Sequence, residues 1–213
     1  MINIKKLFYF SLTILILIII CCIGFQYHNT YKKKENYKQK IIEELKSGLL
    51  FIEEVFNKDL ELVKKEIDAH FQSFLEEDVD LNEEQLLRLK VLVNDSFMRL
   101  QPPSEYLRSE YWQSSKQSGI LSQFLVHKLK QLNRAYSERD KLVATEKIVQ
   151  KFGFNSASIH TMFSKEISKR ELEIIHRKYQ KFFLEYSTIA KGTGFQYYNA
   201  IEILEDKFQN LCY

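Results

Sequence analysis

The sequence predicts an all-α protein: a single N-terminal transmembrane helix, then a long amphipathic helix and a multi-helix bundle. Three observations carry this prediction. The chain of 213 residues has only two prolines and six glycines. Apolar residues recur every three or four positions from residue 41 to residue 211, whereas strand-like alternation is rare. An uncharged apolar run stands close to the N-terminus.

The composition is that of a globular protein, with 45% hydrophobic and 28% charged residues, which excludes an intrinsically disordered chain. From residue 26 onward, 29 basic and 28 acidic residues nearly cancel, so no strong overall field favours nucleic acid. Cys21 and Cys22 lie in the apolar run and Cys212 is next to last. This distribution rules out a disulfide framework for the remaining residues and leaves the redox compartment open.

Residues 7–25 read LFYFSLTILILIIICCIGF, an uncharged run of 19 residues. About 20 apolar residues span the hydrocarbon core of a bilayer as a helix. The run is longer than the apolar region of a cleaved signal peptide, and no Ala-x-Ala pattern follows it. We therefore expect residues 1–25 to anchor a single-pass protein in the lipid bilayer of a plasma or inner membrane.

Lysines on both sides of residues 7–25 bear on the orientation. Lys5 and Lys6 directly precede the run, as in an uncleaved signal anchor, which favours an extracytoplasmic soluble part. The basic juxtamembrane segment, residues 26–40, carries more lysines, and the positive-inside rule then favours a cytoplasmic soluble part. These lysines are Lys32, Lys33, Lys34, Lys38 and Lys40. We expect the extracytoplasmic arrangement, and the cytoplasmic one stays open.

Residues 41–100 are predicted to form a long helix and an antiparallel partner helix. In residues 41–75 the apolar side chains share one helix face, which suits a stalk or a homo-oligomeric coiled coil. They are Leu45, Leu49, Ile52, Phe56, Leu60, Val63, Ile67, Phe71 and Phe74. The opposite face, which includes Glu43 and Glu44, is expected to be solvated. Asn82 is expected to cap the partner helix, which runs to Leu100.

Residues 101–119 are predicted to form a break with a short helix, because Pro102 and Pro103 end the preceding helix and Ser104 can cap a new one. Residues 120–213 are predicted to form a C-terminal helical bundle. Its expected helices cover residues 120–136, 142–152, 156–163, 168–191 and 196–211. The glycines Gly153, Gly192 and Gly194 are expected to end helices, and Ser168 and Glu171 to form a capping box.

The turn of a helix-turn-helix DNA reader is suggested by the apolar spacing around Gly153, between Ile148 and Phe163. In that interpretation five polar residues would reach base edges: Asn155, Ser156, Ser158, His160 and Thr161. The second helix has no arginine and only Lys165 near its end, although basic residues usually supply much of the affinity for DNA. Two packed helices with ordinary caps explain the same residues.

Metal and catalytic motifs are incomplete. Glu173 and His176 have the Glu-x-x-His spacing of di-iron bundles, but only one copy is present. The calcium-loop pattern that starts at Asp78 has Glu83 where glycine is needed and Leu89 where glutamate is needed. No glycine-rich phosphate loop, Cys and His cluster or nucleophile elbow occurs. We therefore predict no catalytic residue, no cofactor and no metal.

Two aromatic groups are candidates for a docking surface. The first, Tyr106, Tyr111 and Trp112, lies beside the proline break and lacks a clear helical period, which favours an interaction surface. The second has helical spacing, which favours core packing instead. Its members are Phe182, Phe183, Tyr186, Phe195, Tyr197 and Tyr198.

The sequence thus favours a membrane-anchored helical protein that binds a protein partner as an assembly component or scaffold. Two alternatives stay open. One is a membrane-tethered helix-turn-helix DNA-binding regulator with its turn at Gly153, and the other is an extracytoplasmic sensory or ligand-binding bundle.

Overall fold

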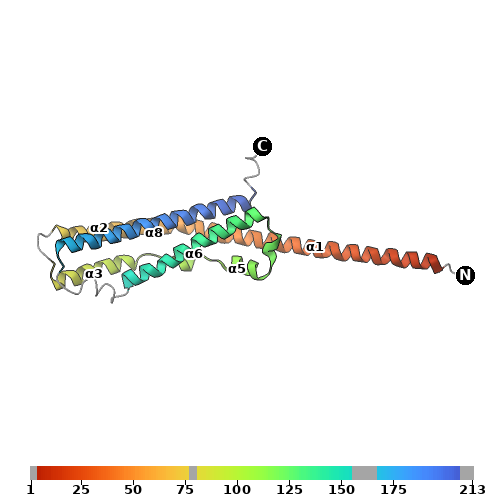
Figure 1. Cartoon of the computed structure of the whole chain (residues 1–213), viewed down its shortest axis with the longest axis horizontal. Coiled ribbons are helices and arrows are strands. Elements are labelled where there is room, and N and C mark those ends of the chain that lie inside the picture. Colours follow the sequence, from red (N-terminus) through yellow and green to blue (C-terminus); the bar gives the residue numbers. More distant parts are fainter. Residues whose placement is uncertain (1–3, 77–80, 155–166, 207–213) are drawn as a thin grey trace, which may run out of the picture.

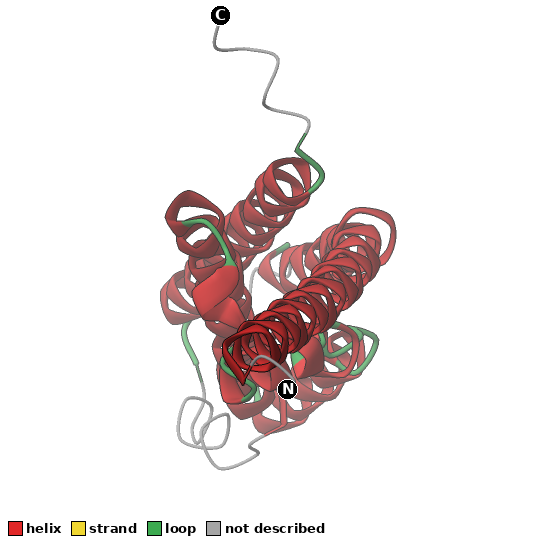
Figure 2. Cartoon of the chain, turned by 90° about the vertical axis from the view of Figure 1, so that its right-hand side faces the viewer, coloured by secondary structure: helices red, strands yellow, loops and turns green. Residues whose placement is uncertain are grey.

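The computed structural model describes residues 4–76, 81–154 and 167–206, and within these ranges the chain is a helical bundle with one long helix that extends from it (Figures 1 and 2). Strands are absent from the described ranges, where the only bridge of β type joins Leu81 to Ile167. The predicted all-helical bundle is confirmed.

The first three elements form one uninterrupted helical rod. They are α1 (Ile4–Leu50), the π-helical segment η1 (Phe51–Phe56) and α2 (Asn57–Leu75). The apolar run and the long amphipathic helix, which were expected to be separate helices, are therefore one element. Residues 26–40 contain no glycine or proline and are rich in Lys and Gln, so nothing in them ends a helix.

The N-terminal part of this rod carries bare apolar side chains. Among the described residues, one helix, Ile14–Leu75, is long and apolar enough to cross a membrane. Its most apolar stretch has a mean hydropathy of 1.6 and none of it is buried in the protein. The side chains from Ile14 to Ile20 are all exposed. Length and composition therefore agree with a single membrane span.

A helical hairpin and two short helices follow. Helix α3 (Glu83–Phe97) begins at Asn82, which forms a capping box with Gln85, so the predicted cap is confirmed. Helix α4 (Pro103–Tyr106) begins at Pro103, so Ser104 lies inside it and is not the cap that the sequence predicted. The Ser104 amide and hydroxyl instead both donate to Glu146, each at 2.8 Å. Helix α5 (Glu110–Gln117) and the 3₁₀ turn η2 (Ile120–Gln123) complete the segment.

Two long helices close the bundle where the sequence predicted four shorter ones. Helix α6 (Val126–Phe154) spans the expected break near residue 140 and continues through Gly153, which therefore does not follow its end. Helix α8 (Lys169–Leu204) opens with the predicted capping box of Ser168 and Glu171. It then runs through Gly192 and Gly194, which were expected to end it. In α8, packing of the buried residues around these glycines, such as Ala190 and Tyr197, outweighs the low helix propensity of glycine.

Helix α8 packs against both the rod and α6 and runs antiparallel to them (Figure 1). His176 near the start of α8 lies 2.7 Å from Asp68 of α2, and Glu205 directly after α8 forms an ion pair with Lys46 of α1. The apolar face of residues 41–75 packs into this shared core, including Leu45, Phe56 and Phe71. That face is therefore buried within the chain itself.

Two glycines mark the closest approach of α8 to the rod. A Cβ at Gly48 would lie 2.5 Å from Cε2 of the buried Tyr197 ring and 3.2 Å from Cδ2 of Leu107. A Cβ at Gly194 would lie 3.5 Å from Cγ2 of Ile52. Gly194 thus has a packing role, although it was expected to end a helix.

Candidate interaction surface

The end of the bundle nearest the apolar run is organised by a buried carboxylate. Glu44 of α1 accepts a hydrogen bond from the hydroxyl of Tyr136 and another, at 3.0 Å, from the backbone amide of Tyr111. Burial raises the pKa of the Tyr136 phenol, and the charge of Glu44 and its hydrogen bond act in the same direction. Glu44 was expected to be solvated but is only 8% exposed, and it joins α1 to α5 and α6.

The only tryptophan completes this cluster. The Trp112 ring stacks on Tyr136 with a centroid distance of 4.8 Å and parallel planes, and 2% of the residue is exposed. Trp112 therefore belongs to the core, and the sequence-based assignment to an interaction surface does not hold for this residue. The cause is the rotation of α5, which turns Trp112 and Ser115 inward.

Tyr106 and Tyr111 keep exposed surface, as an interaction role requires. Tyr106 lies flat on Phe51 of η1, with ring centroids 4.5 Å apart. Tyr111 lies under the Lys40 ammonium, 5.0 Å from the ring centroid. The predicted aromatic group is thus divided: two rings are partly open, and the third holds α5 in place.

Lysines and acids link the helices at this same end. Lys116 lies over Trp112 at 4.6 Å, and Lys34 lies over Phe124 at 5.8 Å. Asp206, which follows α8 with a positive φ of 59°, pairs with Lys38 of α1 and with Lys128 of α6. The hydrogen bonds from the two lysines lower the pKa of Asp206. One carboxylate therefore ties the end of α8 and the start of α6 to the middle of α1.

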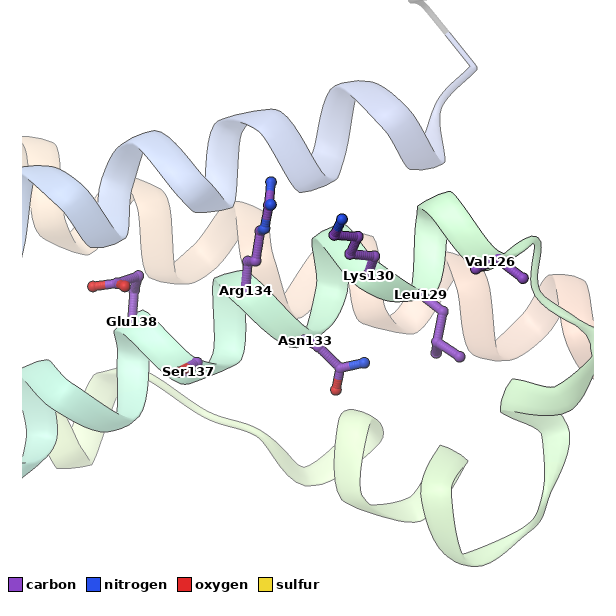
Figure 3. A pocket seen from close by; sticks show the side chains of 7 residues that line it. All are labelled: Val126, Leu129, Lys130, Asn133, Arg134, Ser137 and Glu138. Atoms are coloured by element: carbon purple, nitrogen blue, oxygen red, sulfur yellow. The ribbon is translucent and has the colours of Figure 1, made fainter.

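A shallow hollow of about 620 Å³ lies along the first turns of α6. All the residues that line it come from this one helix: Val126, Leu129, Lys130, Asn133, Arg134, Ser137 and Glu138. Figure 3 shows Lys130 and Arg134 directed toward α8, and Leu129 and Asn133 directed to the other side. A hollow lined by a single helix does not enclose a small molecule, so it is better described as an open helix face.

An apolar stripe on α8 faces outward. Leu184, Phe195 and Tyr198 are 67%, 62% and 51% exposed, and their spacing places them on one face of the helix. Phe183, Tyr186 and Tyr197 of the second aromatic group are buried. Core packing, which the helical spacing favoured, therefore holds for these three rings, whereas Phe195 and Tyr198 are open. We call Leu184, Phe195 and Tyr198 the α8 stripe.

The polar residues that suggested a metal site are used in structural pairs. His176 meets Asp68 at 2.7 Å and stacks on Phe71, whereas Glu173 pairs with Arg177 at 3.6 Å. Within the described ranges, no group of three or more His, Cys, Asp or Glu residues is placed to hold a metal ion.

Asp68 predicts a measurable pH dependence. Burial acts to raise the pKa of this carboxyl, but hydrogen bonds from Lys64, His176 and Gln180 outweigh it and lower the pKa below 3.8. The carboxylate therefore stabilises the fold above pH 3.8, and this contribution is lost as the pH falls through the pKa of the folded state. We expect Asp68→Asn to lose about 1 kcal/mol of unfolding free energy at neutral pH.

The difference between Asp68→Asn and the parent protein should shrink in acid, where both side chains are neutral. Urea unfolding followed by circular dichroism at a series of pH values measures it, with exposed Asp95→Asn as the control. A difference that stays constant down to the lowest pH would contradict this account.

The proposed DNA-reading residues, Asn155, Ser156, Ser158, His160 and Thr161, lie outside the described residues. Helix α6 reaches Phe154, one residue past Gly153, and the helix-turn-helix interpretation stays a prediction. Comparison with known proteins found no family model that matches the chain, and no curated protein or solved structure with significant similarity to it.

Proposed function

We propose that this chain is a single-pass membrane protein whose helical bundle binds another protein, as an assembly component or scaffold. No catalytic step is assigned to it. The observation that carries the proposal is the α8 stripe, because it exposes large apolar side chains on a helix whose opposite face is packed into the core. Exposed apolar side chains grouped on one face are characteristic of protein interfaces.

The anchor is the second part of the proposal. In water, the bare apolar surface of α1 between Ile14 and Phe25 would be unfavourable, whereas hydrocarbon accommodates it. A bilayer around this helix would place the bundle at a fixed height above the membrane, because α1 continues into the core without a break. We propose that the bundle faces away from the cytoplasm. A topology reporter fused after Tyr213 tests this orientation.

The outer face of α8 is suited to a partner that also carries charge. Lys191 lies on the same face between Leu184 and Phe195, and Lys181 next to the stripe lies 3.8 Å from Glu185. Phe195 and Tyr198 supply aromatic contact area at a low cost in side-chain entropy. Oligomerisation through residues 41–75, which the sequence suggested, would have to use the polar outer face of that helix, since its apolar face is in the core.

Position-specific crosslinking in living cells tests the proposed interface. A photoreactive phenylalanine analogue at residue 184 or 195 is expected to give one discrete adduct with a protein that mass spectrometry can identify. The same analogue at Gln72, an exposed residue of α2, is the control and should give none. An aspartate substitution at residue 184 should abolish the adduct formed by the analogue at residue 195, and the reverse should hold as well. The circular dichroism spectrum of each variant should stay that of the helical parent protein.

Three outcomes would count against the proposal. If the analogue at residue 72 gave adducts of the same mass as those from residues 184 and 195, the crosslinks would reflect non-specific proximity and not an interface. No adduct from either stripe position would remove the α8 stripe as an interface. If the protein did not fractionate with membranes, the proposed anchor would be refuted, whatever the result for the interface.

A further inference from the structure

The turn between η2 and α6 is the part of the bundle closest to the apolar run. Lys34 lies over the Phe124 ring of this turn at 5.8 Å, and Lys128 shares Asp206 with Lys38. The turn therefore sits beside the part of α1 around residue 34, where α1 leaves the bundle (Figure 1). Lys34 follows Phe25 by nine residues, which is about 14 Å along a helix.

Two apolar side chains on this turn have little protein around them. Val126 is 83% exposed and Leu125 is 57% exposed. Phe124 and Ile120, next to them, are buried and hold the turn against the bundle. Leu125 and Val126 thus form an apolar tip on a fixed support, at the end of the bundle from which α1 extends.

The surroundings of this tip are basic. Residues 26–40 carry five lysines and a single acid, Glu35. Residues 111–137 carry Lys116, Lys128, Lys130 and Arg134 and no acid, while Asp206 at the end of α8 offsets part of the charge of Lys38 and Lys128. Lys32, Lys33, Lys130 and Arg134 are exposed. A positive surface with an apolar tip is complementary to a layer of anionic headgroups over hydrocarbon.

The segment between the tip and the apolar run also suits a membrane interface. Tyr27 and Tyr31 are exposed on α1, and tyrosine is enriched at the headgroup level of membrane proteins. A headgroup layer takes up about 5 to 8 Å of the distance between Phe25 and the turn. Transmembrane helices commonly tilt by about 20°. If α1 tilted toward the side on which the turn lies, the turn would move closer to the lipid.

We propose that Leu125 and Val126, together with the surrounding lysines, seat on the headgroup layer of the membrane that holds α1, and that anionic phospholipid strengthens this contact. The inference rests on the proposed membrane anchor. Both orientations of the chain leave this end against a headgroup layer, so the contact does not depend on the side of the membrane. It gives the bundle a second contact with the bilayer and a preferred direction of tilt.

Depth-dependent quenching in vesicles tests this contact with the full-length chain. Cys21, Cys22 and Cys212 are replaced by serine, and Val126→Cys carries a nitrobenzoxadiazole label. Leu87→Cys carries it as the control, because Leu87 is also an exposed apolar residue (56%) but lies on α3. The vesicles are phosphatidylcholine with or without phosphatidylglycerol, and contain lipids with a spin label near the headgroup.

The label at residue 126 is expected to shift its emission to the blue and to be quenched by the lipid spin label, whereas the label at residue 87 does neither. Quenching should increase with phosphatidylglycerol and decrease with added salt, because screening weakens the attraction of exposed charges. Lys32→Glu with Lys33→Glu should remove the part that depends on phosphatidylglycerol.

Each other outcome overturns a defined part of the inference. A label at residue 126 that behaves like the label at residue 87 in both vesicles refutes the contact. Equal quenching with and without phosphatidylglycerol refutes the role of anionic lipid. A blue shift without lipid quenching shows that protein, such as a second copy, covers the tip. Protein that does not float with the vesicles refutes the anchor itself, which separates that failure from failure of the contact.

Discussion

Replacing Gly48 by leucine is expected to lower the free energy of unfolding by about 3 kcal/mol or more. Even the first added carbon would lie 2.5 Å from the Tyr197 ring, and that residue is 1% exposed. The gain in helix propensity on replacing glycine, about 1 kcal/mol, is too small to offset this overlap. Urea unfolding in detergent, followed by the fluorescence of Trp112, measures the loss.

Gly192→Leu is the matched control, because Gly192 also lies inside a helix but a Cβ added there would have nothing within 4 Å of it. This variant should be as stable as the parent protein, or more stable by up to about 1 kcal/mol. Equal stability of the two leucine variants would show that α1 and α8 do not cross as closely as described.

Removing the Trp112 side chain is expected to cost about 3 to 5 kcal/mol of unfolding free energy. The indole is almost fully buried, stacks on Tyr136 and lies under the Lys116 ammonium. Trp112→Ala would leave a cavity between α5 and α6 and loosen the Tyr136 ring that donates to Glu44. Far-ultraviolet circular dichroism in urea measures the loss, since the variant has no tryptophan to follow.

Tyr111→Ala is the appropriate comparison for the tryptophan variant. The Tyr111 ring is partly exposed, and its contact with Glu44 uses the backbone amide, which alanine retains. We expect this variant to lose about 1 kcal/mol or less. A Trp112→Ala variant as stable as Tyr111→Ala would mean that α5 is not packed against α6 through the indole.

The sequence allowed prediction of the parts of the fold that depend on local signals. Asn82 and Ser168 open helices because a polar cap and a glutamine or glutamate three residues later act within a single turn. The apolar spacing of residues 41–75 likewise identified the face that is buried in the core. These features do not depend on which helices pack together.

Features that depend on tertiary packing were not predictable in this way. Gly194 resembles a helix end until α8 is placed against the rod, where it continues past Gly194 beside Ile52. Glu44 belongs to a charged run and looks solvated until Tyr111 and Tyr136 are brought to it from distant parts of the chain. Trp112 looked exposed because a helix as short as α5 shows too few turns to define its buried side.

The same limit applies to the α8 stripe. Phe183, Tyr186 and Tyr197 share an aromatic-rich stretch with Phe195 and Tyr198, and the spacing alone cannot assign each ring to the inside or the outside. The neighbours decide, because the rod and α6 cover one side of α8 and leave the other side open. A sequence signal for the stripe does exist, in the steps of eleven and three residues from Leu184 to Phe195 and Tyr198.

With the proposed anchor in a bilayer, the continuous rod from α1 to α2 would also fix how the bundle is turned about the membrane normal. A helix advances by about 100° per residue, and no loop between Ile4 and Leu75 can absorb a rotation. If the lipid-facing part of α1 rolls about its axis, the bundle must roll by the same angle, and the direction in which α8 points rolls with it. In the proposed membrane-anchored state, the orientation of α1 within the bilayer would therefore set the direction in which the α8 stripe faces.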